Sequence, residues 1–148
     1  MAKTKGRQSD SRLADMSIPA PREEMGYSLP DPEEREDIDV RVVLAPGGHE
    51  LYVHYGLWRE RMIVEFAIMQ IVRHNGQWAE VARIDTCHGN VHHHQLGKSR
   101  PNDSVGLRTL LEDLPHNNPW TVVDRWYERA LEKMEAEWTE ALRRWRRG

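Results

Sequence analysis

The chain has few of the features that mark several common classes of protein. It contains one cysteine, Cys87, in 148 residues, which excludes an internal disulfide framework and fits a reducing compartment. No apolar run approaches the roughly 18 residues of a membrane span, and the basic start lacks the apolar stretch of a signal peptide. The formal net charge is −3, so contact with nucleic acid would depend on a local patch rather than on bulk charge. These absences favour a cytoplasmic protein without a membrane partner.

The first part of the chain lacks a periodic apolar pattern. Residues 1–37 are rich in proline, begin basic and turn acidic. Such a segment cannot bury enough apolar surface to offset the entropy lost when it becomes ordered. The sequence therefore predicts a disordered tail over residues 1–37 and a single domain over residues 38–148, which is long enough to bury a core.

Alternating and apolar runs separated by turn residues predict about five antiparallel strands. The turn Pro46-Gly47-Gly48 joins residues 38–45 to residues 50–56 as a hairpin. Residues 62–72 are apolar at odd and even positions alike, which is typical of a central strand covered on both faces. Asn75-Gly76 favours a two-residue turn into a strand over residues 78–86. Gly89-Asn90 is predicted to make a similar turn into a strand over residues 91–96.

Two helical patterns follow these strands. A short helix, capped by Asp103 or Ser104 and ended by Pro115, is predicted by the spacing of Leu107, Leu110, Leu111 and Leu114. A long helix starting at Asn118-Pro119 is predicted by an apolar stripe of Trp120, Val123, Tyr127, Leu131, Met134, Trp138, Leu142 and Trp145. We expect the stripe to pack on the sheet, while a coiled-coil seam or a homodimer through this Trp-rich helix is the alternative. The predicted class is α+β: an antiparallel β-meander of about five strands packed against a long C-terminal helix and one short helix.

Four of the eight histidines lie within residues 88–94. Two-residue turns on either side would place Phe66 opposite Asp85 and Asp85 opposite His94. Because side chains alternate along a strand, one face would then carry Arg83, Asp85, Cys87, His92 and His94. The opposite face would carry Glu65, Thr86, His88 and His93. A one-residue slip in register would exchange these assignments.

The first of these faces has the groups for acid–base chemistry. A carboxylate such as Asp85 raises the pKa of a neighbouring imidazole and fixes its tautomer, which suits a general acid or base near neutral pH. His94 and His92 would supply two imidazoles, and Arg83 is a candidate for binding a substrate phosphate. Two histidines and a cation are sufficient for RNA cleavage without a metal.

Other interpretations of the same residues remain open. His92-x-His94 places two imidazoles on one strand face, and a divalent metal would use His88, His92 and His94, or Asp85 in place of His88. A solvated polar hairpin without a catalytic task is a further interpretation. Cys87 is expected to be a small structural residue rather than a reactive thiolate. Glu65 is the only charge in an apolar strand, and we expect it to pair with an arginine such as Arg129.

The motif at the centre of the chain resembles that of a known family. The stretch Trp78-x-x-Val-Ala-Arg-Ile-Asp85-x-x-His88-Gly-x-x-His92-x-His94 follows an apolar strand and an Asn-Gly hairpin. It is similar to the TumE-like toxins of bacterial toxin–antitoxin systems and to related small domains. The resemblance covers residues 60–96 and matches Asp85, His88, His92 and His94, with Gly89 making the turn. His93 and Cys87 fall outside the pattern, as do the N-terminal segment and the Trp- and Arg-rich last helix.

The resemblance implies a growth-inhibiting protein that acts on RNA or its metabolism and is neutralised by a cognate antitoxin. Combined with the imidazoles, it leads to the hypothesis of a metal-independent ribonuclease that needs no cofactor. The alternatives are a non-enzymatic interaction protein of a phage or mobile element, and a small metal-binding domain that holds a divalent metal at the histidine cluster.

Overall fold

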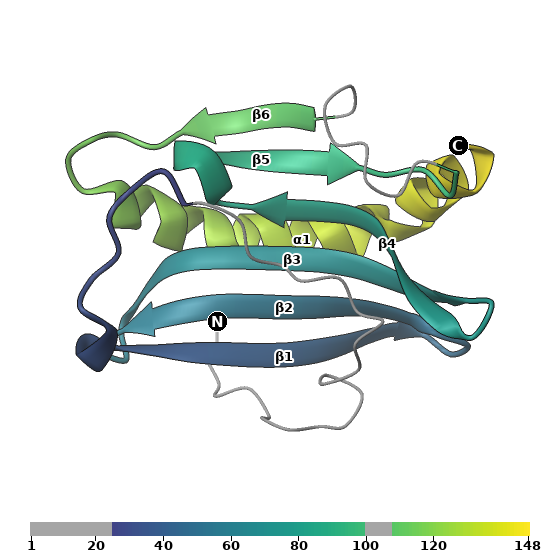
Figure 1. Ribbon diagram of the computed structural model, residues 1–148, viewed down its shortest axis with the longest axis horizontal. Coiled ribbons are helices and arrows are strands. Elements are labelled where there is room, and N and C mark those ends of the chain that lie inside the picture. Colours follow the sequence, from purple (N-terminus) through teal and green to yellow (C-terminus); the bar gives the residue numbers. More distant parts are fainter. Residues whose placement is uncertain (1–24, 100–107) are drawn as a thin grey trace.

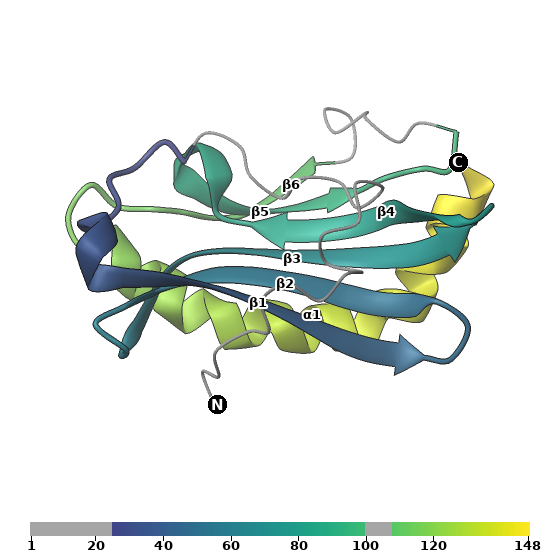
Figure 2. The ribbon, with the colours of Figure 1, turned by 60° about the horizontal axis from the view of Figure 1, so that its bottom comes forward.

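The protein is a six-stranded antiparallel sheet with one long helix across one face (Figures 1 and 2). The computed structural model describes residues 25–99 and 108–148. In these residues the strands follow chain order across the sheet: β1 (Arg35–Ala45), β2 (His49–Trp58), β3 (Met62–His74), β4 (Gln77–Asp85), β5 (Asn90–Gln95) and β6 (Arg108–Asp113). The helix is α1 (Pro119–Arg147), and two short 3-10 turns are η1 (Pro32–Glu34) and η2 (Cys87–Gly89). The predicted α+β meander is confirmed, with six strands rather than about five.

The hairpin turns between β1 and β2 and between β3 and β4 form where the sequence predicted them. Gly47 and Gly48 have φ angles of 91° and 89°, and Asn75 and Gly76 have φ angles of 52° and 78°. Glycine and asparagine adopt this left-handed region at low cost, so these residues reverse the chain without strain. The buried run of β3, residues 63–72, confirms the predicted central strand.

The apolar stripe of α1 packs on the sheet, as predicted. Its side chains at Val123, Met134, Leu142 and Trp145 are buried in the core. The Tyr127 ring packs against one aromatic ring from β2 and one from β3, those of Tyr55 and Phe66. Each such side chain contributes about 1.5–3 kcal/mol when it leaves water, so this interface accounts for much of the stability of the fold. A homodimer through the helix stays a prediction. In the described residues, no helix combines the length and apolar content needed to cross a membrane.

The predicted short helix before residue 115 is wrong. Residues 108–113 form the edge strand β6, which pairs with β5, and the proposed cap at residues 103 or 104 lies outside the described residues. Leucine spacing in so short a run does not separate helix from strand. The free edge of β5 offers backbone hydrogen bonds to this segment, and Leu111 and Leu114 still pack against the core. Leu110, on the other side of the strand, is 55% exposed.

Ordered structure begins before the boundary predicted at residue 38. Residues 1–24 of the predicted tail lie outside the described residues, but β1 already starts at Arg35. The Tyr27 hydroxyl donates a hydrogen bond to the Val64 carbonyl at 2.7 Å and lies 3.0 Å from the Thr86 hydroxyl. These bonds to distant strands hold the segment in place, although its composition gave no sign of them.

A β-bulge in β4 decides which side chains share a face. Gln70 pairs with Ala82 and Ile71 pairs with Glu80, so Val81 is the extra residue. Its side chain is fully buried in the core on the helix side of the sheet. The bulge moves the register by one, and Ala67 rather than Phe66 lies opposite Asp85.

Candidate functional site

The face of the sheet opposite α1 carries a cross-strand row of polar groups. Successive pairings align Asp39, His54, Ala67, Asp85 and His92 on β1 to β5. Side chains in such a row share one face of the sheet. The pair Asp39–His54 therefore lies on one side of Ala67, and the pair Asp85–His92 lies on the other side. Asp85 is 0% and His92 1% exposed, which places the charged end of the row inside the protein.

A tight turn between β4 and β5 brings the residues of the histidine motif together. Thr86 precedes the 3-10 turn η2, in which His88 has a φ angle of 62° and Gly89 a φ angle of 77°. The predicted two-residue turn at Gly89-Asn90 is therefore wrong. A left-handed histidine costs roughly 1–3 kcal/mol, and the surrounding structure must hold it there.

The pairing of β4 with β5 differs from the predicted one by two residues. Asp85 lies opposite His92 and Arg83 opposite His94, rather than Asp85 opposite His94 and Cys87 opposite His92. A shift of two keeps the strand side chains on the face that they were given, whereas Cys87, the fifth residue predicted for this face, lies in the turn η2. The prediction that Arg83, Asp85, His92 and His94 share a face is thus confirmed, although their partners are exchanged.

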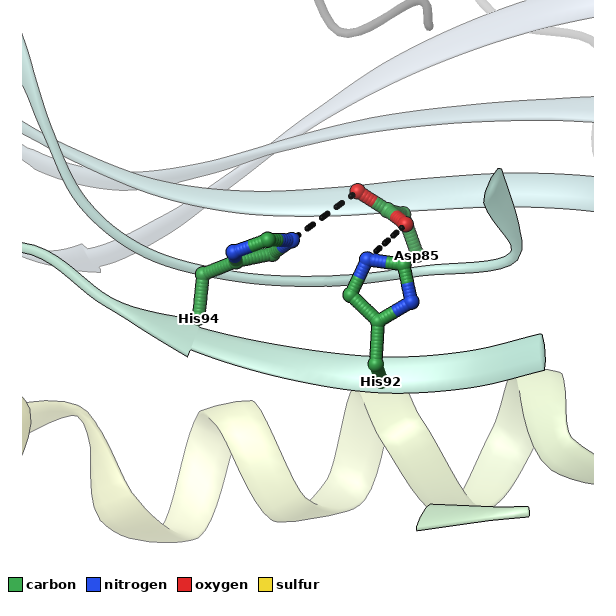
Figure 3. A group of neighbouring side chains, drawn as sticks. All are labelled: Asp85, His92 and His94. Carbon is green, nitrogen blue, oxygen red and sulfur yellow. Dashed lines mark ion pairs between the residues drawn. The ribbon is translucent and has the colours of Figure 1, made fainter. Parts of the chain in front are cut away.

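Asp85 is the centre of the cluster drawn in Figure 3. Its Oδ1 lies 2.9 Å from Nε2 of His92, and its Oδ2 lies 4.0 Å from Nε2 of His94. The two imidazole rings stand edge to face with centroids 4.5 Å apart. The short contact to His92 lacks regular hydrogen-bond alignment, since Nε2 of His92 has no hydrogen-bond partner, and it is an ion pair when the imidazole is protonated.

The opposite side of the His92 ring is held by the turn. Nδ1 of His92 lies 2.6 Å from Oδ1 of Asn90, whose amide nitrogen donates to the His88 carbonyl at 3.4 Å. The amide oxygen thereby accepts the Nδ1 proton, and Nε2 is directed at the carboxylate of Asp85. Sequence analysis missed Asn90 in this role, because it was assigned only to the turn.

Several groups act on the ionisation of Asp85. Burial opposes its charge, but the neighbouring His92 imidazole, the Cys87 backbone N–H at 3.1 Å and the Arg83 guanidinium together hold the pKa of Asp85 below its usual value. The carboxylate is therefore ionised at neutral pH inside the protein. An ionised, oriented carboxylate next to two imidazoles is suited to proton transfer.

Arg83, predicted to bind a substrate phosphate, is engaged within the protein. Its guanidinium donates two hydrogen bonds to the carboxylate of Glu80, at 2.6 and 2.8 Å, and Nη1 lies 3.5 Å from Oδ2 of Asp85. This bidentate geometry neutralises much of its charge. The structure thus places Arg83 as a support for Asp85.

The remaining predicted residues separate from the cluster. His88 is exposed at the rim, with its ring centroid 6.2 Å from that of His92. His93 points to the other face, as predicted, into a small cavity beside Lys133 of α1; burial and the lysine charge lower its pKa. Cys87 is buried, in agreement with a structural role.

Glu65 lies on the same face as Asp85, which corrects the predicted opposite placement. The bulge at Val81 causes the difference, because it changes which residues of β3 and β4 share a face. The partner of Glu65 is Arg35 of β1 at 3.5 Å rather than Arg129 of the helix. Alternating charges along β1 were the sequence signal for this second polar cluster.

Among the residues that the structure describes, two groups of side chains have donor atoms close enough to bind a metal ion. In each group these atoms lie within 4.8 Å of one another: Asp85, His92 and His94 form one, and Asp37, His54 and Glu65 the other. Two imidazoles and one carboxylate are a common ligand set for divalent metals. In the second group the guanidinium of Arg35 lies beside both carboxylates, at 3.5 and 3.9 Å, whereas in the first Arg83 lies 3.5 Å from Asp85 but hydrogen-bonds to Glu80 instead. The first group is thus the better metal candidate, with Asp85 in the place predicted for His88.

Comparison with known families places most of the chain in one family. The family model described as "Domain of unknown function (DUF7718)" matches residues 52–147, which include most of the sheet, the histidine motif and α1. No curated protein matches the chain, and no solved structure does. The matched segment covers more than half of the 148 residues, and the chain therefore belongs to the DUF7718 family.

Proposed function

We propose that the protein is a cytoplasmic ribonuclease toxin of the TumE-like kind, neutralised by a cognate antitoxin, with its site at Asp85, His88, His92 and His94. The observation that carries the proposal is the convergence of His92 and His94 on one buried carboxylate, with an exposed histidine beside them. The resemblance of the motif to that of TumE-like toxins involves the same four residues and supports the proposal. The proposed reaction uses no metal and no other cofactor.

RNA carries its own nucleophile, the 2′-hydroxyl, so a metal-free ribonuclease needs a base for this group and an acid for the leaving oxygen. His88 is exposed and would contact the substrate, and His92 lies behind it at 6.2 Å between ring centroids. His88 takes the 2′-hydroxyl proton as the 2′ oxygen bonds to phosphorus, and it gives the proton to the 5′ oxygen as the P–O5′ bond breaks. His92, whose Nδ1 faces Asn90 and whose Nε2 faces Asp85, acts from behind His88 and does not touch the RNA. The products are a 2′,3′-cyclic phosphate and a 5′-hydroxyl.

The buried groups behind these two histidines orient them. Asp85 holds the His92 ring by its Nε2 side and stabilises the positive charge that the ring carries when protonated. Asn90 holds the same ring by Nδ1, and Arg83 keeps the carboxylate in position. Loss of a general acid or base typically lowers the rate by 10²–10⁴-fold, so His88→Ala should lose at least about a hundredfold, and His92→Ala, which removes the ring behind it, should also lower the rate.

The proposal is tested first in cells, by inducing the wild type, His92→Ala, His94→Ala and the matched control His93→Ala. His93 lies on the same strand but faces away from Asp85, so its variant should arrest growth like the wild type. The two site variants should permit growth at equal protein level. Equal arrest by all four proteins, or arrest by none, would overturn the assignment of the site.

A second candidate function, metal-dependent chemistry at the same residues, is favoured by one specific observation. Nδ1 of His92 is hydrogen-bonded to the Asn90 side chain. Metal-bound histidines commonly have such a bond at one ring nitrogen, while the other nitrogen binds the metal. Cleavage of RNA by the purified protein with and without EDTA separates the two. Unchanged activity in EDTA and a 2′,3′-cyclic phosphate end support the metal-free reaction; loss in EDTA with recovery on addition of Zn²⁺ or Mn²⁺ supports the metal.

A further inference from the structure

A cleft of about 610 Å³ lies at the end of the sheet where β4 turns into β5 and the chain passes from β6 to α1. Its walls include Tyr27, His88, His116 and Trp120. Both ribbon views show the segment after residue 25, the turn η2 and the start of α1 meeting at this end of the molecule (Figures 1 and 2). The volume is in the range of sites that take a small organic molecule or a short piece of a polymer.

The walls of this cleft are fixed by backbone hydrogen bonds between distant segments. The Gly89 N–H donates to the Met25 carbonyl at 2.7 Å, and the Leu114 N–H donates to the Gly89 carbonyl at 3.0 Å. On the far side, Nε1 of Trp120 donates to the Ser28 carbonyl at 2.9 Å. The turn that carries His88 is therefore held from both sides, and a ligand would meet a preformed surface.

The chemistry of the cleft suits unpaired nucleobases. His88 and His116 are exposed and Trp120 is half-buried, so imidazole and indole rings border one opening. Such rings stack on the faces of bases in single-stranded RNA, with little dependence on the base. The N-terminus of α1, which begins at Pro119 in the same wall, adds a partial positive charge that favours phosphate.

The aromatic surface continues beyond the cleft toward arginines. The ring of Trp120 lies 5.2 Å from that of Trp58, and the guanidinium of Arg59 lies 4.6 Å over the Trp58 ring. Arg59 and Arg61 line an adjoining cavity of about 180 Å³. Arg59 is paired with Glu34, but both side chains are largely exposed, at 58% and 40%, so this pair is weak and can give way to a phosphate. A chain with a net charge of −3 needs such a local patch to bind RNA.

We propose that this cleft, from His88 past Trp120 to Arg59, binds a short stretch of single-stranded RNA and delivers its backbone to the histidine site. The inference rests on the proposed function and adds the substrate class and its path. His88 connects the cleft to the histidine site. It lines the cleft, and its ring centroid lies 6.2 Å from that of His92. Duplex RNA is excluded as the preferred ligand, since paired bases cannot stack on these rings.

The test is fluorescence anisotropy with a labelled RNA of about ten nucleotides whose 2′-hydroxyls are replaced by 2′-O-methyl groups, so that it binds without being cleaved. Trp120→Ala and His116→Ala should each weaken binding about tenfold, and Trp120→Phe, which keeps a stacking ring, should bind like the wild type. His49→Ala is the matched control, because this histidine lies at the opposite end of the sheet beside Trp138. Circular dichroism establishes that each variant is folded.

The outcomes separate this inference from the proposed function. Binding that depends on Trp120 and His116, with no cleavage of unmodified RNA by the wild type, would retain the cleft and overturn the nuclease. Cleavage that depends on His92 but is unaffected in Trp120→Ala and His116→Ala would overturn the cleft and retain the nuclease. Equal binding by wild type and both folded cleft variants, no binding by any protein, or a preference for duplex RNA would also overturn the inference.

Discussion

Replacing Asp85 by asparagine tests the interior of the site independently of any substrate. Asparagine has nearly the same shape as aspartate but carries no charge. The carboxylate is 0% exposed, accepts a hydrogen bond from the Cys87 N–H, and lies within 2.9 Å of His92 and 3.5 Å of Arg83. Asp85→Asn removes the only negative group in contact with His92 among those described, and leaves the two hydrogen bonds from Arg83 to Glu80 in place.

The expected cost follows from these contacts. Removing one partner of a buried ion pair destabilises a protein by about 3–5 kcal/mol, because the other charge stays buried without compensation. Arg83 keeps its two hydrogen bonds to Glu80, so the low end applies. We expect a loss of about 3 kcal/mol at pH 7, which corresponds to a decrease of about 1.5 M in the urea midpoint for a slope near 2 kcal/mol per M.

The pH dependence gives a second, sharper measurement. The pKa of Asp85 is lowered in the folded protein, so its stabilisation is complete above the unfolded value of about 3.9 and is lost as the pH falls through the folded value. The free energies of unfolding of wild type and variant should therefore differ most at pH 6–7, and the difference should shrink as the pH falls below about 4.

Urea unfolding followed by the fluorescence of the six tryptophans measures both effects. Asp113→Asn is the matched control, because Asp113 is exposed at the end of β6 and its loss should change stability by less than about 0.5 kcal/mol. Equal midpoints for wild type and Asp85→Asn at pH 7 would refute the reasoning. So would a difference that stays constant down to pH 3.

Two further predictions concern the frame around the site. Gly26→Ala should cost about 2 kcal/mol or more, because its Cβ would lie 2.7 Å from the Gly89 nitrogen at a φ angle of 73°; Gly76→Ala, at a φ angle of 78° in open space, should cost only about 1 kcal/mol. Thermal melts compare the two, and an equal loss would contradict the predicted clash. Thr86→Val should cost about 1–3 kcal/mol, because the hydroxyl accepts from the Phe66 N–H at 3.2 Å and lies 3.0 Å from the Tyr27 hydroxyl. The exposed Thr121→Val is its control in urea unfolding, and similar midpoints for the two variants would show that the buried hydroxyl contributes little.

The parts of the fold that the sequence predicted depend on local rules. Asn75-Gly76 makes its turn because both residues tolerate positive φ, and the α1 stripe packs on the sheet because its spacing fits one helix face. β6 was mistaken for a helix because its partner, the edge of β5, is a tertiary feature. Apolar spacing over six residues does not contain that information.

The register of the site shows the same limit in more detail. The bulge at Val81 arises because the core on the helix side takes up this side chain, which no local pattern announces. The turn at His88 is one that the Gly89-Asn90 signal did not suggest, since a histidine adopts the left-handed conformation there. The face shared by Asp85, His92 and His94 was nevertheless predicted correctly, because the error in their pairing was two residues and side chains alternate with a period of two.

The charged face of the sheet is hard to explain by stability alone. Each buried ion costs several kcal/mol of lost hydration, and well-packed apolar side chains in its place often give an equally stable or more stable protein. The opposite face already provides a continuous apolar core with α1. Glu80, Arg83, Asp85 and His92 are nevertheless all less than 10% exposed and lie on neighbouring strands. Burial of these groups is not explained by the stability of the fold. It is explained by a site that holds an ionised carboxylate next to imidazoles and away from water.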